Sequence, residues 1–331
     1  LRQQLEARAE DIALEGFEVA APWDKVSWNE FNRISAAIAG ILIANGFEVQ
    51  DRAVILSHNC PQWTCADVGV VRARGVVVPV YPTSTLKQAA YIINDAGAKV
   101  LFVANKAQYR LACQLEALCP TLELVVVFDK HVTLEKLHHH HLDVLLNQVV
   151  TEEARTELVA REQNATLDDL LTLIYTSGTT GDPKGVMLDQ RNFASAMRQH
   201  FQLIPFEADQ VSLVFLPLSH VYERGWTFYV LSRGGRNVYL TDTHRVKEAI
   251  AAVRPHTLCV VPRFLEKVYS AVQDKVTRAG NGSRKLFAWA LAVGERQFEV
   301  MQGRAQPSKK LSLQWYLADK LVYRQLRAAL G

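Results

Sequence analysis

Short apolar runs recur along the first half of the chain, and polar stretches long enough to form helices separate them. The runs are rich in Val, Ile and Leu, which is typical of buried strands. They fall at residues 53–57, 76–80, 99–104 and 122–128. Strands that alternate with helices of about ten or more residues predict an α/β fold, with parallel sheets flanked by helices on both faces.

Capping and turn residues mark where the helices between these strands begin and end. Ser27-Trp-Asn-Glu30 is a capping box, and it opens a helix that Gly46 stops. Thr83-Ser84 likewise cap a helix that ends at Gly97. The other helices of this half are expected from Pro61 to before Gly75, over residues 107–119 and within residues 1–20.

The same alternation continues in the second half and ends in a helical region. Strands are expected at residues 170–175, 211–218, 237–241 and 257–261, with helices at 190–201, 219–232, 244–253 and 263–279. After Gly280 the sequence predicts two long helices around a break at Pro307. We therefore expect two α/β subdomains, residues 1–165 and residues 166–331.

Residues 129–165 interrupt the alternation and are expected to form a surface excursion. They contain the run His138–His141 and a charged stretch, Thr151–Glu162. Four adjacent histidines suggest metal binding, but consecutive side chains do not converge on one ion as spaced ligands do. We therefore expect the histidine run to lie in a solvated loop or helix end.

The segment Tyr175-Thr-Ser-Gly-Thr-Thr-Gly-Asp-Pro-Lys-Gly185 lies between two predicted strands and suits a polyphosphate. Its glycines allow close backbone approach, and successive N–H groups in such a turn form an anion-binding concavity. The spacing is not that of a P-loop, because Lys184 precedes Gly185 and a strand follows. A flexible hairpin without a ligand is the alternative. The candidate phosphate-binding residues are Thr176, Ser177, Gly178, Thr179, Thr180, Gly181 and Lys184.

This segment resembles the phosphate-binding signature of the adenylate-forming (AMP-binding) superfamily. Two further stretches, Leu216–Arg224 and Val260–Lys267, are similar to motifs of bacterial long-chain fatty-acid–CoA ligases. The resemblance covers most of the chain. It implies the fold of the large N-terminal domain of these enzymes and ATP-dependent activation of a long-chain fatty acid. The acid would pass through acyl-AMP to acyl-CoA, with release of AMP and pyrophosphate.

The resemblance also implies roles for individual residues. The loop, with Lys184, would hold the β- and γ-phosphates of ATP, and Thr176 would help to position Mg²⁺. His220 would lie near the substrate carboxylate and the α-phosphate, whereas a lone histidine is otherwise more often structural. CoA is the expected acyl acceptor.

The segment that follows His220 carries charged and bulky residues on a predicted helix. Arg224 is expected to form an ion pair, whereas Glu223 is kept as a candidate catalytic residue with an ion pair as the alternative. Trp226, Gly234 and Gly235 are candidates for the wall of an acyl tunnel, and ordinary core packing is the alternative for them.

Several superfamily motifs do not occur in this sequence. The aromatic-Gly-x-Thr-Glu motif that stacks adenine is absent, as are the ribose-binding Thr-Gly-Asp, the hinge and the C-terminal lid. We therefore expect the N-terminal portion of a ligase, with little or no adenylation by these 331 residues alone. Transfer to a carrier protein, activation of aromatic acids and a non-catalytic phosphate-binding module are the alternatives.

Composition and charge narrow the cellular setting. A net charge of +3 is too small to indicate nucleic-acid binding, and no apolar run reaches the length of a membrane span. Five cysteines without C-x-x-C spacing indicate reduced thiols in a cytoplasmic protein. From Arg278 onward ten Lys and Arg face three acidic residues. A solvated helical face or a peripheral contact with anionic lipid would account for this excess.

Overall fold

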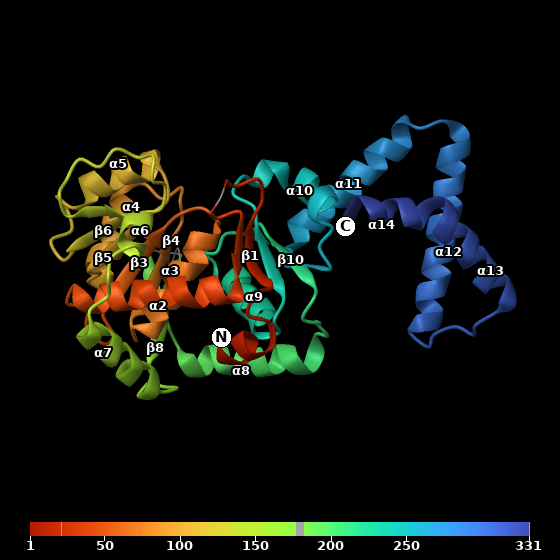
Figure 1. Cartoon of the computed structure of the whole chain (residues 1–331). Helices are drawn as coiled ribbons and strands as arrows, with labels where there is room; N and C mark the ends of the chain where they lie inside the picture. Colours follow the sequence, from red (N-terminus) through yellow and green to blue (C-terminus); the bar gives the residue numbers. More distant parts are fainter. Residues whose placement is uncertain (21, 177–181, 331) are drawn as a thin grey trace. The chain divides into compact units, whose positions relative to one another are not determined.

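The computed structural model describes residues 1–20, 22–176 and 182–330. Its contacts divide the chain into two compact units, Leu1–Thr243 and His244–Gly331 (Figure 1). The boundary expected after residue 165 falls inside the first unit and stays a prediction about subdomains. We describe each unit by itself.

The first unit contains a seven-stranded sheet in the order β7-β6-β5-β3-β4-β8-β9. Its strands are parallel except for β9, which pairs antiparallel with β8. The predicted α/β fold with a parallel sheet is therefore confirmed, with an antiparallel hairpin at one edge. The strands are β3 (Arg52–Leu56), β4 (Val76–Val80), β5 (Val100–Val103), β6 (Leu124–Val127), β7 (His139–His141), β8 (Leu170–Thr176) and β9 (Lys184–Asp189).

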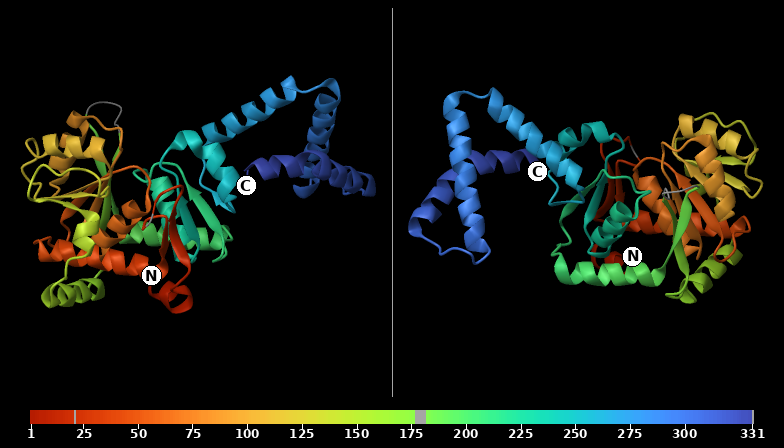
Figure 2. Two further views of the ribbon diagram at one scale, coloured as in Figure 1. Left: turned by 45° about the horizontal axis from the view of Figure 1, so that its top comes forward. Right: turned by 180° about the vertical axis from the view of Figure 1, so that it is seen from behind.

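Helices cover both faces of this sheet because its central strands are apolar on both sides (Figure 2). Successive strand residues point to opposite faces. Accordingly, Ile55 packs in the core cluster that contains α2 and α3, whereas Val54 and Leu56 pack in the cluster that contains α4 and α5. The helices of this half are α1 (Arg2–Arg8), α2 (Trp28–Ala44), α3 (Pro61–Arg72), α4 (Leu86–Ala96), α5 (Lys106–Leu115), α6 (Leu142–Leu146) and α7 (Glu152–Gln163).

The predicted cap is confirmed at α2, where half of the predicted box forms, and it is shifted at α4. Ser27 accepts a hydrogen bond from the backbone N–H of Glu30 at 3.2 Å, whereas the Glu30 carboxylate accepts from Arg33. At α4 the cap is Thr85 rather than Thr83-Ser84, and it forms a full capping box with Gln88. The sequence offers three consecutive hydroxyl residues there, and only Thr85 has a glutamine three positions later.

The solvated position expected for the histidine run holds for His138, which is exposed, but is wrong for residues 139–141. Residues 139–141 form the edge strand β7, which pairs in register with β6, and the His139 side chain is fully buried. Residues 129–138 form no helix or strand, and most of the later part of the expected excursion forms α6 and α7. Leu142, Leu145 and Leu158 from these helices pack in the same core cluster as α2 and α3.

A second sheet in the first unit joins strands from distant parts of the sequence. β10 (Val211–Val214) and β11 (Arg236–Tyr239) run parallel, and β11 continues to β1 (Ile12–Gly16), followed by β2 (Lys25–Ser27). The helix expected within residues 1–20 is therefore wrong for residues 12–16. Two helices accompany these strands, α8 (Gln190–Leu203), capped by Asp189, and α9 (Val221–Ser232).

The second unit is almost entirely helical. A small core forms where Ala290 and Val293 of α12 pack with Leu311, Ala318 and Val322. Among the described residues, no helix combines the length and the apolar character needed to cross a membrane. Its elements are η1 (Thr243–Arg245), α10 (Val246–Val253), β12 (Thr257–Leu258), α11 (Pro262–Arg278), α12 (Asn281–Met301), α13 (Lys309–Ala318), the π-helical turn η2 (Asp319–Tyr323) and α14 (Arg324–Leu330).

Buried polar contacts join the two sheets of the first unit. The guanidinium of Arg224 in α9 donates two hydrogen bonds to Asp67 in α3, at 2.6 and 2.8 Å, and both side chains are fully buried. The hydroxyls of Thr64 and Tyr239 lie 2.8 Å apart in the same interior. The ion pair predicted for Arg224 is confirmed, and it fixes α9 against α3.

We predict that Asp67→Asn lowers the free energy of unfolding by about 3–5 kcal/mol, because it leaves the Arg224 charge buried without its counter-charge. The matched control is Asp168→Asn, whose partner Arg191 is exposed. This control is expected to cost less than about 1 kcal/mol. Urea denaturation of both variants measures the difference. Equal losses would show that the buried pair contributes no more than a surface pair.

Candidate functional site

The predicted phosphate loop is closed by the last rung of the β8–β9 hairpin. Thr176, the last residue of β8, pairs in register with Lys184, the first residue of β9. Both side chains are exposed. Ser177, Gly178, Thr179, Thr180 and Gly181 lie outside the described residues. The structure therefore brings a hydroxyl and an ammonium group together at the two ends of the loop.

Polar contacts hold β8 in place beneath this rung. The Tyr175 hydroxyl donates to Asp95 at 2.6 Å, and the Thr172 hydroxyl donates to the carbonyl of Val77 in β4 at 2.6 Å. Burial, followed by the hydrogen bond to Asp95, raises the pKa of Tyr175, so its hydroxyl keeps the donor proton. A Cβ added at Gly185 would lie 3.0 Å from Cζ of Tyr175. Gly185 thus lets β9 approach the tyrosine ring closely.

His220 is the N-cap of α9 and is exposed. Its Nδ1 accepts a hydrogen bond from the backbone N–H of Tyr222 at 3.1 Å. That bond fixes the ring orientation and leaves Nε2 as the nitrogen available to donate or accept elsewhere. A histidine in place of the usual Ser or Asp cap combines a local structural bond with a second ring nitrogen that this bond does not use.

Glu223 lies in the first turn of α9, fully buried. Neither carboxylate oxygen has a hydrogen-bond partner among the described residues, and the same holds for the buried hydroxyl of Ser219. Burial raises the pKa of Glu223 well above its usual range, and the backbone of Leu216 opposes this only in part. A buried carboxyl without a counter-charge is held as the neutral acid, which is a hydrogen-bond donor. The ion pair considered for Glu223 does not form among the described residues.

The three tunnel candidates lie in packed surroundings. The indole N–H of Trp226 donates to the Ser212 hydroxyl at 2.9 Å, and its ring packs against Tyr229. Gly234 has a φ of +81°, a left-handed conformation that favours glycine after the C-terminus of α9. A Cβ at Gly235 would meet the Phe206 ring at 2.2 Å. These contacts explain the three residues as packing and turn residues, and their role in a tunnel stays a prediction.

Sequence reasoning missed Asn59, which follows β3 and contacts the segment that leads to His220. Its amide donates to the carbonyl of Leu216 at 2.8 Å and accepts from the N–H of Leu218 at 3.0 Å. Asn59 also lines a cavity of about 300 Å³ near the carboxyl ends of β3, β5 and β6, where α/β sheets commonly bind ligands. The only signal in the sequence is a polar residue three positions after a buried strand.

The chain belongs to the family of AMP-binding enzymes. The model of that family matches residues 1–312, which include both sheets, the hairpin and α9. This confirms the family resemblance.

Two similar proteins are named long-chain-fatty-acid–CoA ligases. The chain is 30% identical over 327 residues to the long-chain-fatty-acid–CoA ligase ACSBG1 of Rattus norvegicus, with 96% of this chain and 44% of the relative covered. It is 32% identical over 312 residues to the long-chain-fatty-acid–CoA ligase FadD15 of Mycobacterium bovis, with 93% and 50% covered. The chain thus spans about half the length of these relatives.

A solved structure shows the same fold. The N-terminal domain of FACL13 from Mycobacterium tuberculosis superimposes with a TM-score of 0.62 at 21% identity, over 80% of this chain and 62% of that domain. The predicted architecture of an adenylate-forming N-terminal domain is therefore confirmed.

We predict that Glu223 makes the folded state less stable as the pH rises. Its pKa is higher in the folded chain than the ordinary value of 4.5, so the folded state binds this proton more tightly. The contribution of Glu223 to the free energy of unfolding is therefore most favourable below the pKa that Glu223 has in the unfolded chain. It is lost as the pH rises through the pKa that Glu223 has in the folded chain. Glu223→Gln should gain stability relative to the wild type as the pH rises from about pH 5 towards neutral pH, by up to about 1.4 kcal/mol per pH unit.

Urea denaturation across this pH range measures the effect. Glu30→Gln is the control, because a hydrogen bond from Arg33 lowers the pKa of Glu30. The control should show no such gain above about pH 5. A pH-independent difference between wild type and Glu223→Gln would contradict a neutral Glu223.

Proposed function

We propose that the protein to which this chain belongs activates a long-chain fatty acid with ATP and transfers the acyl group to CoA. The observation that carries the proposal is the pairing of Thr176 with Lys184 at the base of a glycine- and hydroxyl-rich loop. Family membership and the names of the relatives support the same reaction.

The first step is condensation of the carboxylate with ATP. A carboxylate oxygen attacks the α-phosphorus, the bond from that phosphorus to the pyrophosphate oxygen breaks, and acyl-AMP forms. The step needs charge stabilisation and alignment more than a protein nucleophile. The Lys184 ammonium and the loop hydroxyls would bind the β- and γ-phosphates and hold them as the leaving group.

Mg²⁺ suits this arrangement as a partner of the nucleotide. It prefers oxygen ligands and usually binds through few protein groups together with phosphates and water. The exposed hydroxyl of Thr176 at the end of β8 fits as one such ligand. Bound there, Mg²⁺ would neutralise part of the phosphate charge.

His220 and Glu223 would act near the carboxylate and the α-phosphate, away from the β- and γ-phosphates. The exposed edge of the His220 ring would donate a hydrogen bond to the substrate carboxylate or the α-phosphate. Glu223 would support the turn beneath it as a neutral acid. In the second step the CoA thiol loses its proton to water and its sulfur attacks the acyl carbonyl carbon. The bond from that carbon to the AMP oxygen breaks, and acyl-CoA and AMP are released. Trp226, Gly234 and Gly235 stay candidates for the acyl-chain wall.

The cellular setting is a further part of the proposal. We place the protein in the cytoplasm, with a peripheral contact to anionic lipid through the basic region after Arg278. Counted from Arg278 itself, this region has ten Lys and Arg and three acidic residues, and its positive charge supports the contact.

We predict that Lys184→Ala and Thr176→Ala each weaken binding of a non-hydrolysable ATP analogue about tenfold or more, because each removes a contact to a phosphate oxygen. Isothermal titration calorimetry on the 331-residue chain measures the affinity. The matched controls are Lys25→Ala in β2 and Thr156→Ala in α7, both exposed and outside the hairpin. Unchanged affinity in the hairpin variants would overturn the phosphate role of the loop.

We further predict palmitate-dependent acyl-CoA formation by the product of the complete gene, at a rate that exceeds that with benzoate. Thioester formation from labelled palmitate, ATP and CoA measures the activity. Faster turnover of benzoate would indicate an aromatic-acid ligase, and acyl transfer to a carrier protein but not to CoA would indicate a different acceptor. ATP binding without acyl-AMP formation from either acid would indicate a phosphate-binding module.

A further inference from the structure

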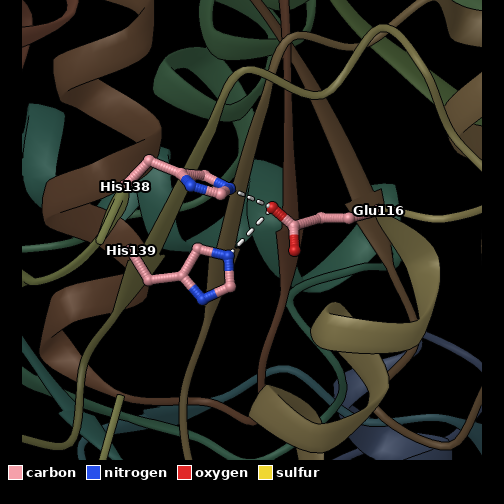
Figure 3. Close-up of side chains that lie close together, drawn as sticks. All are labelled: Glu116, His138 and His139. Carbon is pink, nitrogen blue, oxygen red and sulfur yellow. Dashed lines mark hydrogen bonds and ion pairs between the residues drawn. The ribbon is translucent and has the colours of Figure 1, made fainter. Parts of the chain in front are cut away.

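Three side chains from two separated segments meet outside the nucleotide site. Glu116 is the C-cap of α5, His138 directly precedes β7, and His139 is the first residue of β7 (Figure 3). The Nε2 atoms of His138 and His139 lie 2.7 and 2.9 Å from the same Glu116 oxygen, Oε1. The three candidate ligand atoms all lie within 4.8 Å of one another.

The convergence depends on the way the chain enters β7. Inside a strand, adjacent side chains point to opposite faces, so His139 and His140 cannot share a ligand. His138 lies one residue before the strand and is free of that alternation. Its ring packs edge-on against the ring of His139, with centroids 4.7 Å apart. Both Nε2 atoms therefore reach the end of α5 from one side.

A second set of contacts fixes the buried ring. Nδ1 of His139 lies 2.8 Å from the Tyr109 hydroxyl, and that hydroxyl accepts a hydrogen bond from the backbone N–H of Glu135 at 2.6 Å. An imidazole held through one nitrogen presents the other in a defined direction, as is usual for histidines that bind metals.

We propose that Glu116, His138 and His139 bind a divalent transition-metal ion of the Zn²⁺ class. Two imidazole nitrogens and one carboxylate oxygen are ligands that Zn²⁺ uses, at about 2.0–2.2 Å from the ion. Ligand atoms around such an ion lie about 3.3 Å apart, so the nitrogens need to move from Oε1 by only a few tenths of an ångström. His138 can make this adjustment because 56% of its side chain is exposed. The fourth position would hold water.

Lys136 is the neighbour that competes with the ion. Its ammonium group pairs with the other carboxylate oxygen, Oε2, so the two cations would use different oxygens of Glu116. The alternative is that the cluster is a hydrogen-bonded anchor for β7, in which both histidines donate to Glu116 and no ion binds. A direct measurement of bound metal distinguishes metal binding from an anchor role.

The test uses the 331-residue chain, stripped with a chelator and then titrated with ZnCl₂ against a chromophoric zinc indicator. We expect one high-affinity equivalent, and an affinity lower by about tenfold or more in His138→Ala and in Glu116→Gln. The exposed His138 gives a variant that should fold normally, and circular dichroism checks this. Replacement by Co²⁺ should give the visible absorption of a nitrogen- and oxygen-ligated ion in the wild type only.

The matched control is His140→Ala, which changes a histidine on the opposite face of the same strand. Its zinc affinity should equal that of the wild type. An equal loss in His140→Ala and His138→Ala would show diffuse chelation by the histidine run and overturn the site. Wild-type zinc binding no tighter than that of Glu116→Gln would also overturn it, because the cluster would then be only the anchor of β7.

Discussion

The need to pair a buried charge determines how the two sheets of the first unit fit together. Arg224 is fully buried, and a guanidinium in an apolar interior is tolerated only with a well-placed counter-charge. Asp67 supplies it from α3. The ring of Phe193 lies 5.5 Å from the Arg224 guanidinium carbon and adds a contact to the cation. α9 can therefore occupy only the position at which Arg224 reaches Asp67.

The ion pair of Arg224 also fixes the position of His220, which lies one helical turn before it. The backbone N–H of Arg224 donates to the carbonyl of His220, so the cap histidine is tied to the residue that is fixed against α3. Asn59 holds the preceding segment from the other side through Leu216 and Leu218. His220 is thus exposed, yet its backbone is held at both ends by buried polar bonds. A side chain that orients a reactant needs such support from outside its own loop.

The neighbouring Glu223 shows the opposite arrangement within the same turn. Two of the three Arg224 guanidinium nitrogens bond the Asp67 carboxylate, whereas neither oxygen of the Glu223 carboxyl has a hydrogen-bond partner among the described residues. An uncompensated buried acid lowers stability at neutral pH and is typical of sites where a shifted pKa has a use. The contrast between two adjacent residues indicates that packing alone does not explain Glu223.

Local sequence signals predicted most of the first sheet, because its strands are continuous apolar runs between clear caps. They failed for β1, where five residues complete a sheet whose next strand is β11, more than two hundred residues later. No local pattern specifies such a partner. The loop residues could be proposed from their composition, since glycines, hydroxyls and a lysine are unusual together, and their role stays a prediction. Asn59 could not be proposed in this way, because an amide after a strand is common and its partners are distant in sequence.

The histidine run shows that local sequence signals also fail to predict a site whose residues come from distant segments. Reasoning from adjacent residues was sound for His139 and His140, which alternate across the strand. It failed for the run as a whole because Glu116 lies 22 residues before His138 and reaches it only through the pairing of β7 with β6. The spacing of residues within one segment can show that those residues do not converge on one ion. It does not show whether a residue from another segment joins one of them. Convergence between segments is decided by strand order, which follows from the buried core rather than from the ligand residues themselves.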